Sequence, residues 1–392
     1  MDILSKSTIL YINQTRQENF EKLIGKGISE ALSWYNDFEQ IIFLCYSSTG
    51  NFLYKKKHDN CYLIGIPFDL SSTTFKSIFS IGKNYIDLYF FLNRLSNKTK
   101  IDIVRIENLL ISGLPAYIFC KIKNIPYVVW LGGFERKSLF IKYKKNIFTY
   151  FLSKLIILFE KIILKNSNFV FAVTNELLDL TEKRNVKNKI LSPNFVDLLK
   201  FKNLKKQNTS DSNKKSKILY VGRFEEEKGI KVLMNAIKIL SLDNFETEFL
   251  LIGDGSLKEW ILNFLKNNNL KNVKLLGSFS HEEMPLMYNM ADIFVLPSYT
   301  EGSPASLIEA MSCGIASIAT AVGLCPSLIK NGKNGILVPS GKPLEIANAI
   351  KKLIMNKDLL EKISKNGRKA VVKYTKNYKK IHKYMYEKIL NQ

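Results

Sequence analysis

Short apolar runs and longer segments with a helical period follow one another along most of the chain. Short runs predict buried strands, and apolar residues three and four apart predict amphipathic helices. In the first half the predicted strands are 8–12, 41–46, 61–66, 101–106, 126–131, 169–173 and 189–195. In the second half they begin at 217 and continue at 247–252, 273–276, 292–296, 315–319 and 335–338, with helices at 229–241, 256–268 and 282–290. Strands that alternate with helices in this way are typical of doubly wound α/β domains.

The stretch Asp197–Lys217 interrupts the alternation, since it loses apolar content and is rich in Lys, Asn and Ser. This composition predicts a linker. We therefore expect two Rossmann-like domains, over residues 1–200 and 201–372. Helical patterns continue after residue 343 to the end of the chain.

Composition and charge narrow the classes of function. The chain has 392 residues, of which 46% are hydrophobic and 24% charged, as expected of a globular protein. Lys and Arg outnumber Asp and Glu by 58 to 35, and the net charge of +23 predicts an anionic partner: nucleic acid, a membrane surface or a phosphorylated substrate. Five scattered cysteines predict reduced, mostly buried thiols. No apolar run is long enough for a spanning helix or a signal peptide, so we expect a cytoplasmic location.

Candidate chemistry gathers in Pro297–Gly314, PSYTEGSPASLIEAMSCG, directly after a predicted strand. Ser303 before Pro304 predicts a helix start, because the hydroxyl can cap free N–H groups and proline has none to leave unpaired. Glu301 precedes this start, and Glu309 lies two turns inside the helix. A helix N-terminus at the end of a parallel strand is a common binding site for phosphorylated ligands.

This stretch resembles the Glu-x7-Glu signature of retaining glycosyltransferases of the GT-B fold, family 4 (glycosyl transferases group 1), through its frame PS-x-x-EG-x-P…EAM-x-CG. The segment Gly222–Gly229 resembles the GR-x4-KG pattern of the same family. The resemblance implies a GT-B architecture, with two Rossmann-like doubly wound domains facing a central cleft. Residues 1–200 are then the acceptor-side domain and residues 201–372 bind the nucleotide sugar. The C-terminal helix, about 373–392, is expected to pack back on the first domain.

The resemblance also implies roles for individual residues. Glu301 is the candidate catalytic residue near the donor sugar, and Glu309 binds the ribose hydroxyls. Arg223 and Lys228 place two cations near the departing diphosphate, where positive charge stabilises the transition state. The remaining donor-binding candidates are Gly222, Gly302, Ser303, Ser306, Leu307 and Phe279, of which the Ser306 and Leu307 amides are candidates for the β-phosphate.

One position departs from the family pattern. A histidine commonly follows the strand equivalent to 126–131, near the donor sugar, but Gly132 and Gly133 stand there in this chain. Backbone at the two glycines, together with Glu135 or Glu107, is our candidate replacement on the acceptor or donor-sugar side. An ordinary loop charge is the alternative for both glutamates.

The sequence therefore predicts a retaining glycosyltransferase. It moves a sugar from a nucleotide-sugar donor to a polysaccharide, lipopolysaccharide or lipid-linked glycan acceptor at the cytoplasmic membrane face. No Asp-x-Asp occurs, and the three histidines, His58, His281 and His382, lack metal-ligand spacing, so we expect no metal and no cofactor besides the nucleotide-sugar co-substrate. Each histidine is expected to be an ordinary surface or core residue.

Two other functions remain open. One is a GT-B epimerase or hydrolase that acts on nucleotide sugars. The other is a basic nucleic-acid-binding protein, although the basic residues are spread along the chain and no recognition motif occurs, so we expect no specific nucleic acid.

Residues 146–165 predict a helix with a broad apolar stripe that includes Leu155. A second apolar line, Tyr150, Ile157 and Leu164, lies opposite and is flanked by lysines. Either the helix is buried on two sides, or its outer line dips into an anionic bilayer. The second account predicts a peripheral protein on the inner face of the plasma membrane.

Overall fold

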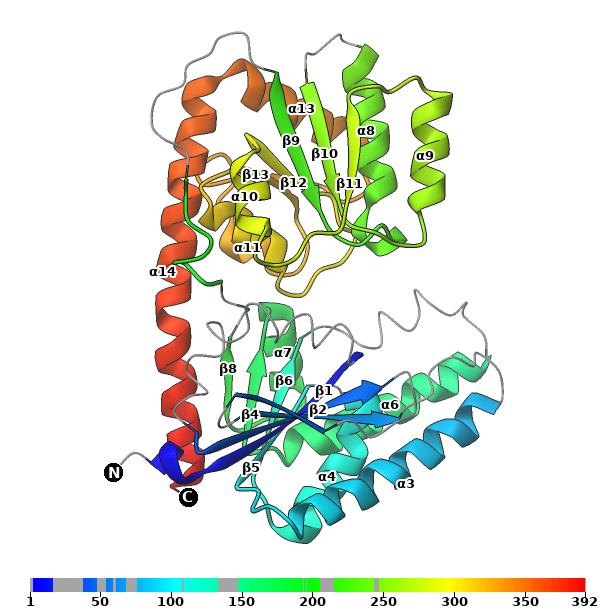
Figure 1. Ribbon diagram of the computed structural model, residues 1–392, viewed down its shortest axis with the longest axis vertical. Helices are drawn as coiled ribbons and strands as arrows, with labels where there is room; N and C mark the ends of the chain where they lie inside the picture. The colour runs from blue at the N-terminus through cyan, green and yellow to red at the C-terminus, as the bar shows by residue number, and fades with distance from the viewer. Residues whose placement is uncertain are drawn as a thin grey trace. The chain divides into compact units, whose positions relative to one another are not determined.

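The computed structural model describes residues 3–16, 38–47, 54–58, 61–67, 76–107, 109–132, 147–192, 194, 196–204, 215–242 and 247–391 (Figure 1). The chain divides into two compact units: Met1–Pro193 with Lys379–Gln392 is unit 1, and Asn194–Tyr378 is unit 2. The prediction set these boundaries at 200/201 and near 373. Phe201, inside the predicted linker, is fully buried in an apolar core cluster of unit 2, and Ser312 Oγ donates a 2.6 Å hydrogen bond to its carbonyl.

Unit 1 is built on an eight-stranded sheet with the order β3-β4-β2-β1-β5-β6-β7-β8. All its strand pairs are parallel except β3 with β4. Strands β5, β6 and β7 are buried along their whole length, as strands covered on both faces are. The strands are β1 (Thr8–Arg16), β2 (Gln40–Ser47), β3 (Tyr54–His58), β4 (Cys61–Pro67), β5 (Ile103–Ile106), β6 (Tyr127–Leu131), β7 (Phe169–Ala172) and β8 (Lys189–Leu191).

Strand β3 is the one strand of the described sheet that the apolar pattern does not predict. Its sequence, YKKKH, is basic, and it pairs antiparallel at the outer edge of the sheet. An edge strand has one free side, where charged residues discourage pairing with other chains. Its polarity therefore hides it from a search for apolar runs.

The helices of unit 1 are α3 (Lys76–Ser96), α4 (Leu114–Lys123), α6 (Ile147–Lys165) and α7 (Asn175–Lys183), with a 3-10 turn at Ile3–Lys6 and a π-helical turn at Leu109–Gly113. They connect β4 to β5, β5 to β6, β6 to β7 and β7 to β8, and every step runs in the same direction across the sheet. Right-handed crossovers in one direction place their helices on one face. In agreement, α4 contacts both α3 and α6 (Figure 1).

Helix α6 lies where a helix was predicted. Ile163 of the predicted core stripe is fully buried, but two other positions differ from the predicted faces. Leu164, assigned to the outer line, is fully buried, whereas Leu155, assigned to the core stripe, is 51% exposed. The Tyr127 hydroxyl of β6 donates a 2.6 Å hydrogen bond to the Ile163 carbonyl, and this close packing of the last turn on the sheet turns Leu164 inward. Ile157 is half-buried, and the side chain of Tyr150 lies outside the described residues.

Unit 2 is a six-stranded, fully parallel sheet with the order β11-β10-β9-β12-β13-β14. The chain proceeds from β9 outward to β11, then crosses back to β12 and proceeds in the other direction. The topological switch point is therefore between β9 and β12, where the carboxyl ends of the strands open a crevice for ligands. The strands are β9 (Ser216–Val221), β10 (Thr247–Ile252), β11 (Val273–Gly277), β12 (Ile293–Leu296), β13 (Ala316–Thr320) and β14 (Ile336–Val338).

The helices of unit 2 are a 3-10 turn, η4 (Glu226–Lys228), α8 (Ile230–Leu242), α9 (Lys258–Asn267), α10 (Met284–Asn289), α11 (Ala305–Ser312), α12 (Cys325–Leu328) and α13 (Pro343–Met355). Two apolar core clusters hold them to the sheet. The first cluster contains the buried side chains of α8 and α13 together with Phe249 of β10. The second contains the buried side chains of α11, such as Leu307. The free cysteines Cys313 and Cys325 are buried here, as Cys120 is in unit 1.

Helix α14 (Lys357–Leu390) begins in unit 2 and ends in unit 1. In unit 1 its last turns bring His382 into the core, where the ring stacks on Phe171 at 4.4 Å and Nε2 lies 2.6 Å from Ser192 Oγ. Burial, with the nearby charge of Arg105, lowers the pKa of His382 well below its usual range. None of the helices in the described ranges has both the length and the apolar content that crossing a bilayer requires.

Candidate active site

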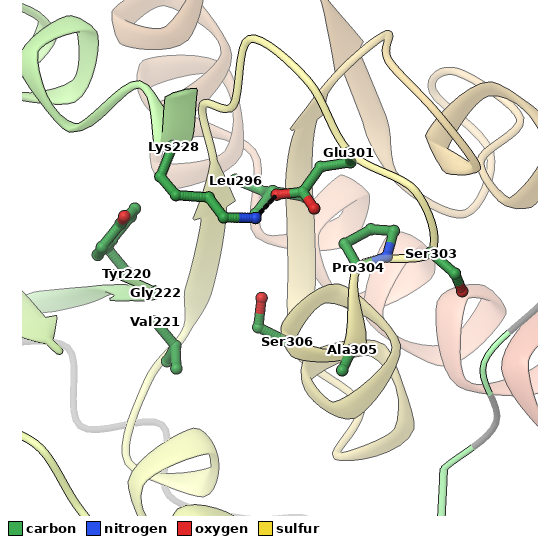
Figure 2. A pocket seen from close by; sticks show the side chains of 10 residues that line it. All are labelled: Tyr220, Val221, Gly222, Lys228, Leu296, Glu301, Ser303, Pro304, Ala305 and Ser306. Atoms are coloured by element: carbon green, nitrogen blue, oxygen red, sulfur yellow. Dashed lines mark hydrogen bonds and ion pairs between the residues drawn. The ribbon is translucent and has the colours of Figure 1, made fainter. Parts of the chain in front are cut away.

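A pocket of about 210 Å³ lies at the switch point of unit 2 (Figure 2). The end of β9, the turn η4, the end of β12 and the first turn of α11 form its walls. The lining residues are Tyr220, Val221, Gly222, Lys228, Leu296, Glu301, Ser303, Pro304, Ala305 and Ser306. Five of the predicted donor-site and catalytic residues are thus brought together: Gly222, Lys228, Glu301, Ser303 and Ser306.

Lys228 and Glu301 meet across the pocket, with 2.8 Å between Nζ and Oε1 (Figure 2). The turn that carries Lys228 ends at Gly229, whose φ of +67° is in the left-handed region that favours glycine. A Cβ at this position would lie 2.0 Å from the Pro297 carbonyl oxygen, so only glycine lets the turn lie against the end of β12. The Tyr299 amide also donates a 2.9 Å hydrogen bond to the Glu227 carbonyl, which holds the two segments together.

Glu301 is a largely buried carboxylate, 7% exposed, with two fixed partners. Besides Lys228, Ser298 Oγ donates a 2.7 Å hydrogen bond to Oε1. Ser298 is itself fixed, since Thr320 Oγ1 donates a 2.7 Å hydrogen bond to its carbonyl. Because both partners engage Oε1, the second oxygen, Oε2, can accept a hydrogen bond from a ligand.

The charge of Glu301 also acts on its neighbours. Burial, and then the negative charge of Glu301, raise the pKa of the Tyr220 hydroxyl, which donates a 2.8 Å hydrogen bond to the Arg223 carbonyl. The same two causes raise the pKa of Cys325 to about 12, so this thiol stays protonated. Tyr220 and Cys325 therefore stay neutral beside Glu301, and its negative charge is balanced by the Lys228 ammonium.

Gly323 lies against the backbone of Glu301 and Gly302. It has a φ of +55°, and a Cβ there would lie 2.2 Å from the Glu301 carbonyl oxygen and 2.7 Å from that of Gly302. The amide of the next residue, Leu324, donates a 2.9 Å hydrogen bond to the Gly302 carbonyl. The contacts of Gly323 and Leu324 with the carbonyls of Glu301 and Gly302 hold the loop that precedes α11 in place.

The predicted role of Ser303 as a helix cap is wrong. Helix α11 begins at Ala305 after Pro304, and in the described structure no side chain caps its first turn. Ser303 Oγ instead accepts a 2.9 Å hydrogen bond from the Asn194 amide, and Asn194 Nδ2 donates at 2.8 Å to the Ser303 carbonyl. The first-turn amides of α11 are therefore left for a ligand, and the positive end of the helix dipole adds to their pull on an anion.

Glu309, a residue of α11, is not among the residues that line the pocket and contacts Tyr288 and His281 instead. The buried Tyr288 hydroxyl donates a 2.8 Å hydrogen bond to Oε2, and His281 Nε2 is 3.2 Å from Oε1. Lys200 Nζ is 3.0 Å from the other ring nitrogen of His281, Nδ1, so the ring bridges a lysine and a carboxylate. His281 is a partly exposed histidine whose two ring nitrogens both have polar partners.

Other predicted donor-site residues lie away from the pocket wall. Arg223 is 66% exposed and forms a 2.8 Å ion pair with Glu227. Phe279 and Leu307 pack their side chains into a core cluster, and Gly302 contributes its carbonyl to the loop contact described above. The structure therefore brings Lys228 to Glu301 and leaves Arg223 in solvent.

Of the candidates in unit 1, Glu107 and Gly132 are described, while Gly133 and Glu135 lie outside the described residues. Glu107 accepts a hydrogen bond from the Tyr11 hydroxyl and forms a 2.9 Å ion pair with the buried Arg105. Gly132 is exposed at the end of β6. Glu107 is thus a fixed carboxylate rather than an ordinary loop charge.

Several residues of the site escaped the sequence reasoning. Ser298 and Gly323 contact Glu301 and its backbone, and Tyr288 and His281 hold Glu309. A signal existed for His281, because Ser280 and Glu283 form a capping pair that places the histidine at the start of a helical turn. In the described ranges no three His, Cys, Asp or Glu side chains gather as they would around a metal ion. The pocket instead offers a cation and backbone amides, which suit a phosphorylated co-substrate.

Similarity to known proteins agrees with this chemistry. Residues 201–370 match the family model "Glycosyl transferases group 1". An uncharacterized glycosyltransferase of Methanocaldococcus jannaschii is 34% identical over 157 residues, which cover 40% of this chain and 43% of that protein. The capsular polysaccharide biosynthesis glycosyltransferase CapM of Staphylococcus aureus is 35% identical over 157 residues, covering 39% and 40%. The chain thus matches about two fifths of the length of these relatives.

Solved structures extend the similarity in fold to nearly the whole chain. Sucrose-phosphate synthase from Thermosynechococcus elongatus has a TM-score of 0.78 at 19% identity, covering 98% of this chain and 100% of that chain. Anabaena HepE in complex with UDP-glucose has a TM-score of 0.65 at 16% identity, covering 95% and 98%. Residues 201–370 therefore match the glycosyl transferases group 1 family, within a chain of the GT-B fold.

Proposed function

We propose that this protein is a glycosyltransferase that moves a sugar from a nucleotide-sugar donor to a glycan acceptor. The observation that carries the proposal is the Lys228–Glu301 pair, which faces the uncapped start of α11 in one pocket. The family of residues 201–370 supports it, and so does the fold relative whose structure contains UDP-glucose.

The pocket supplies what the departing nucleotide requires. The amides of Ser306 and Leu307 can donate to the phosphate oxygens, and the Lys228 ammonium offsets the charge that develops as the diphosphate leaves. Arg223 is our second diphosphate contact and has to leave its solvent-facing pair with Glu227 to reach it. Glu301 orients a hydroxyl of the donor sugar and stabilises the positive charge that develops on the ring.

We further propose that the transfer retains the configuration of the sugar. The acceptor hydroxyl enters on the face from which the diphosphate departs, and a phosphate oxygen takes its proton. This differs from glycoside hydrolysis, in which two carboxylates flank the scissile bond. Glu309 does not line the pocket that contains Glu301, and we propose that it binds the ribose, with Tyr288 and His281 orienting its carboxylate.

For the acceptor, we propose a polysaccharide, lipopolysaccharide or lipid-linked glycan at the cytoplasmic face of the membrane. The similarity to CapM, which is named for capsular polysaccharide biosynthesis, supports this class. Glu107 and Gly132, with Gly133 and Glu135, remain our candidates for the acceptor or donor-sugar side. The fixed carboxylate of Glu107 suits a sugar hydroxyl as its ligand.

A thermal-shift screen of nucleotide sugars tests the donor, because a ligand that binds only the folded state raises the melting temperature. The donor it identifies is then used to assay transfer with Lys228→Ala and the matched control Lys231→Ala. Lys231 lies three residues further on, at the start of α8, and pairs at 2.8 Å with Glu226 outside the pocket. The proposal predicts a large loss of activity for Lys228→Ala only. Binding of no nucleotide sugar, or equal activity of both variants, contradicts it.

An epimerase or hydrolase that acts on nucleotide sugars is the second candidate, because it would use the same pocket. Incubation with the donor alone separates the two, since an epimerase or hydrolase converts the donor without an acceptor. A salt-sensitive shift of DNA without donor binding would instead favour a nucleic-acid-binding protein.

A further inference from the structure

Three neighbouring helices of unit 1 expose pairs of large apolar side chains. The pairs are Ile86 and Phe90 on α3, Ile118 and Ile122 on α4, and Leu155 and Leu158 on α6, each between 41% and 62% exposed. Within the described part of unit 1, Tyr384 is the other large apolar side chain that is as exposed. In unit 2 such side chains are spread over many elements, so the concentration on α3, α4 and α6 is a feature of this face.

The six side chains lie on one surface. Members of a pair are three or four residues apart and therefore share a face of their helix. Other side chains of the same three helices are buried, with Leu88, Phe119 and Ile163 as examples. Helix α4 contacts both α3 and α6, and the three helices lie on the same face of the sheet (Figure 1).

The same three helices are basic. They carry eight lysines and arginines and two acidic residues, a net charge of +6. Lys83, Lys121, Lys154 and Lys161 are exposed within a few residues of the apolar pairs. Of the acidic residues, Glu160 is engaged in a 3.0 Å ion pair with Arg184.

We infer that this surface of α3, α4 and α6 binds an anionic bilayer, with the apolar pairs in the interface and the lysines on lipid phosphates. An exposed apolar patch marks an interaction surface, and apolar side chains among lysines match the headgroup boundary of anionic membranes. A second copy of the chain would bring two surfaces of +6 together. A nucleic acid would engage the lysines but leave six apolar side chains in water.

The inference rests on the proposed function, because a bilayer-binding surface would bring the enzyme to a lipid-linked acceptor in the membrane. The sequence had predicted a membrane contact through Tyr150, Ile157 and Leu164 of α6, but Leu164 is buried. The new surface spans three helices, and α6 contributes Leu155 and Leu158 to it.

Flotation of the full chain with vesicles tests the surface. We compare vesicles of phosphatidylcholine alone with vesicles of equal parts phosphatidylcholine and phosphatidylglycerol, at low and high salt. The variant Phe90→Ser/Ile122→Ser/Leu155→Ser removes one exposed side chain from each helix. Leu242→Ser/Leu262→Ser/Met355→Ser, at exposed positions of unit 2, is the matched control. If circular dichroism shows that the triple variant is unfolded, the single variant Ile122→Ser is tested in its place.

We expect the wild type and the unit 2 control to float with the anionic vesicles only, less so in high salt, and the unit 1 variant to remain at the bottom. Lys121→Gln/Lys154→Gln should weaken binding by roughly fivefold per lysine, whereas Lys238→Gln/Lys266→Gln in unit 2 should not. Equal flotation of the unit 1 variant and the wild type overturns the inference, as does a wild type that binds neither vesicle.

Self-association and donor binding are measured separately from flotation. If lipid-free wild type is a dimer by light scattering and the unit 1 variant is a monomer, a second copy covers the surface and the inference is wrong. Donor binding is measured without vesicles by calorimetry with UDP-glucose and the donor found by thermal shift. Flotation without donor binding refutes the proposed function alone, and donor binding without flotation refutes the membrane surface alone.

Discussion

Lys228 and Glu301, separated by 73 positions in the chain, form a 2.8 Å ion pair at the wall of the pocket. A buried ion pair contributes little net stability, because desolvation of the two charges offsets their attraction. Two glycines that tolerate no Cβ, Gly229 and Gly323, nevertheless hold the segments on which the pair depends. An ion pair that adds little stability, yet is held by such constrained backbone, is expected where the two charges act on a ligand.

Glu301→Gln should lower kcat by about 10²-fold, the order of magnitude for the loss of one well-placed electrostatic group. The amide keeps the size of the side chain but removes its charge. Glu226→Gln is the matched control, since Glu226 pairs with Lys231 outside the pocket, and its kcat should change little. Steady-state kinetics with the identified donor and acceptor measure both. Near-wild-type turnover of Glu301→Gln would remove this residue from the mechanism.

Gly323→Ala should impair both stability and activity, because its Cβ meets the Glu301 carbonyl oxygen at 2.2 Å. Gly332→Ala is the control: its φ of +72° is equally left-handed, but no atom lies within 4 Å of the added Cβ. Both variants incur a left-handed strain of about 1–2 kcal/mol in the free energy of unfolding. The additional loss in Gly323→Ala, measured by urea unfolding and by kcat, reports the contact with the loop. Equal losses in the two variants would show that Glu301 does not depend on this contact.

Tyr288→Phe should raise the donor KM several-fold with little change in kcat, because Glu309 loses the hydroxyl that orients it for the ribose. The free energy of unfolding should fall by about 1.5–3 kcal/mol, the contribution of a hydrogen bond to a charged group. Tyr127→Phe in unit 1 removes another buried hydroxyl, which donates to a carbonyl 2.6 Å away. It should lower stability but leave KM unchanged. A shift in KM for both variants would indicate a general loss of structure.

Transfer should continue in EDTA. In the proposed mechanism the Lys228 cation and the α11 amides neutralise the departing diphosphate, which is the role a divalent metal fills in other sugar transferases. The measurement is initial rate with and without chelator at saturating donor. Activity that is lost in EDTA and returns with manganese or magnesium would contradict metal independence.

Stability should fall on acidification because of His382. Its pKa is lowered in the folded state by burial and by Arg105, whereas it is about 6.5 in the unfolded chain. Below pH 6.5 the unfolded state therefore binds the proton that the folded state refuses. The free energy of unfolding is expected to decrease by up to about 1.4 kcal/mol per pH unit between pH 6.5 and 5 from this group.

His382→Phe keeps an aromatic ring beside Phe171 but cannot titrate. Its free energy of unfolding, measured by urea at several pH values, should depend less steeply on pH than that of the wild type. The same slope in both proteins would mean that other groups dominate this pH range.

Strand positions and the location of the site were predictable because both depend on local patterns. The run 247–252 is observed as β10 with the same bounds, since its last four residues, Phe249–Ile252, are buried and form a continuous apolar signal. The frame around Glu301 and the GR-x4-KG segment placed the site at two strand ends, and both reach one pocket. The charged edge strand β3 left no such signal.

The partners of the site residues were decided only by the tertiary structure. Ser303 looked like a helix cap from its neighbours, but Asn194, 109 positions away, takes its hydroxyl as a hydrogen-bond acceptor. Likewise, His281 contacts Glu309, 28 positions away. Arg223 follows the pocket residue Gly222 in sequence, but its side chain is exposed to solvent. A side chain has several local geometries of similar energy, and packing against distant segments selects one. For the same reason the period of α6 predicted a helix, while its packing on β6 determined that Leu164 is buried and Leu155 is exposed.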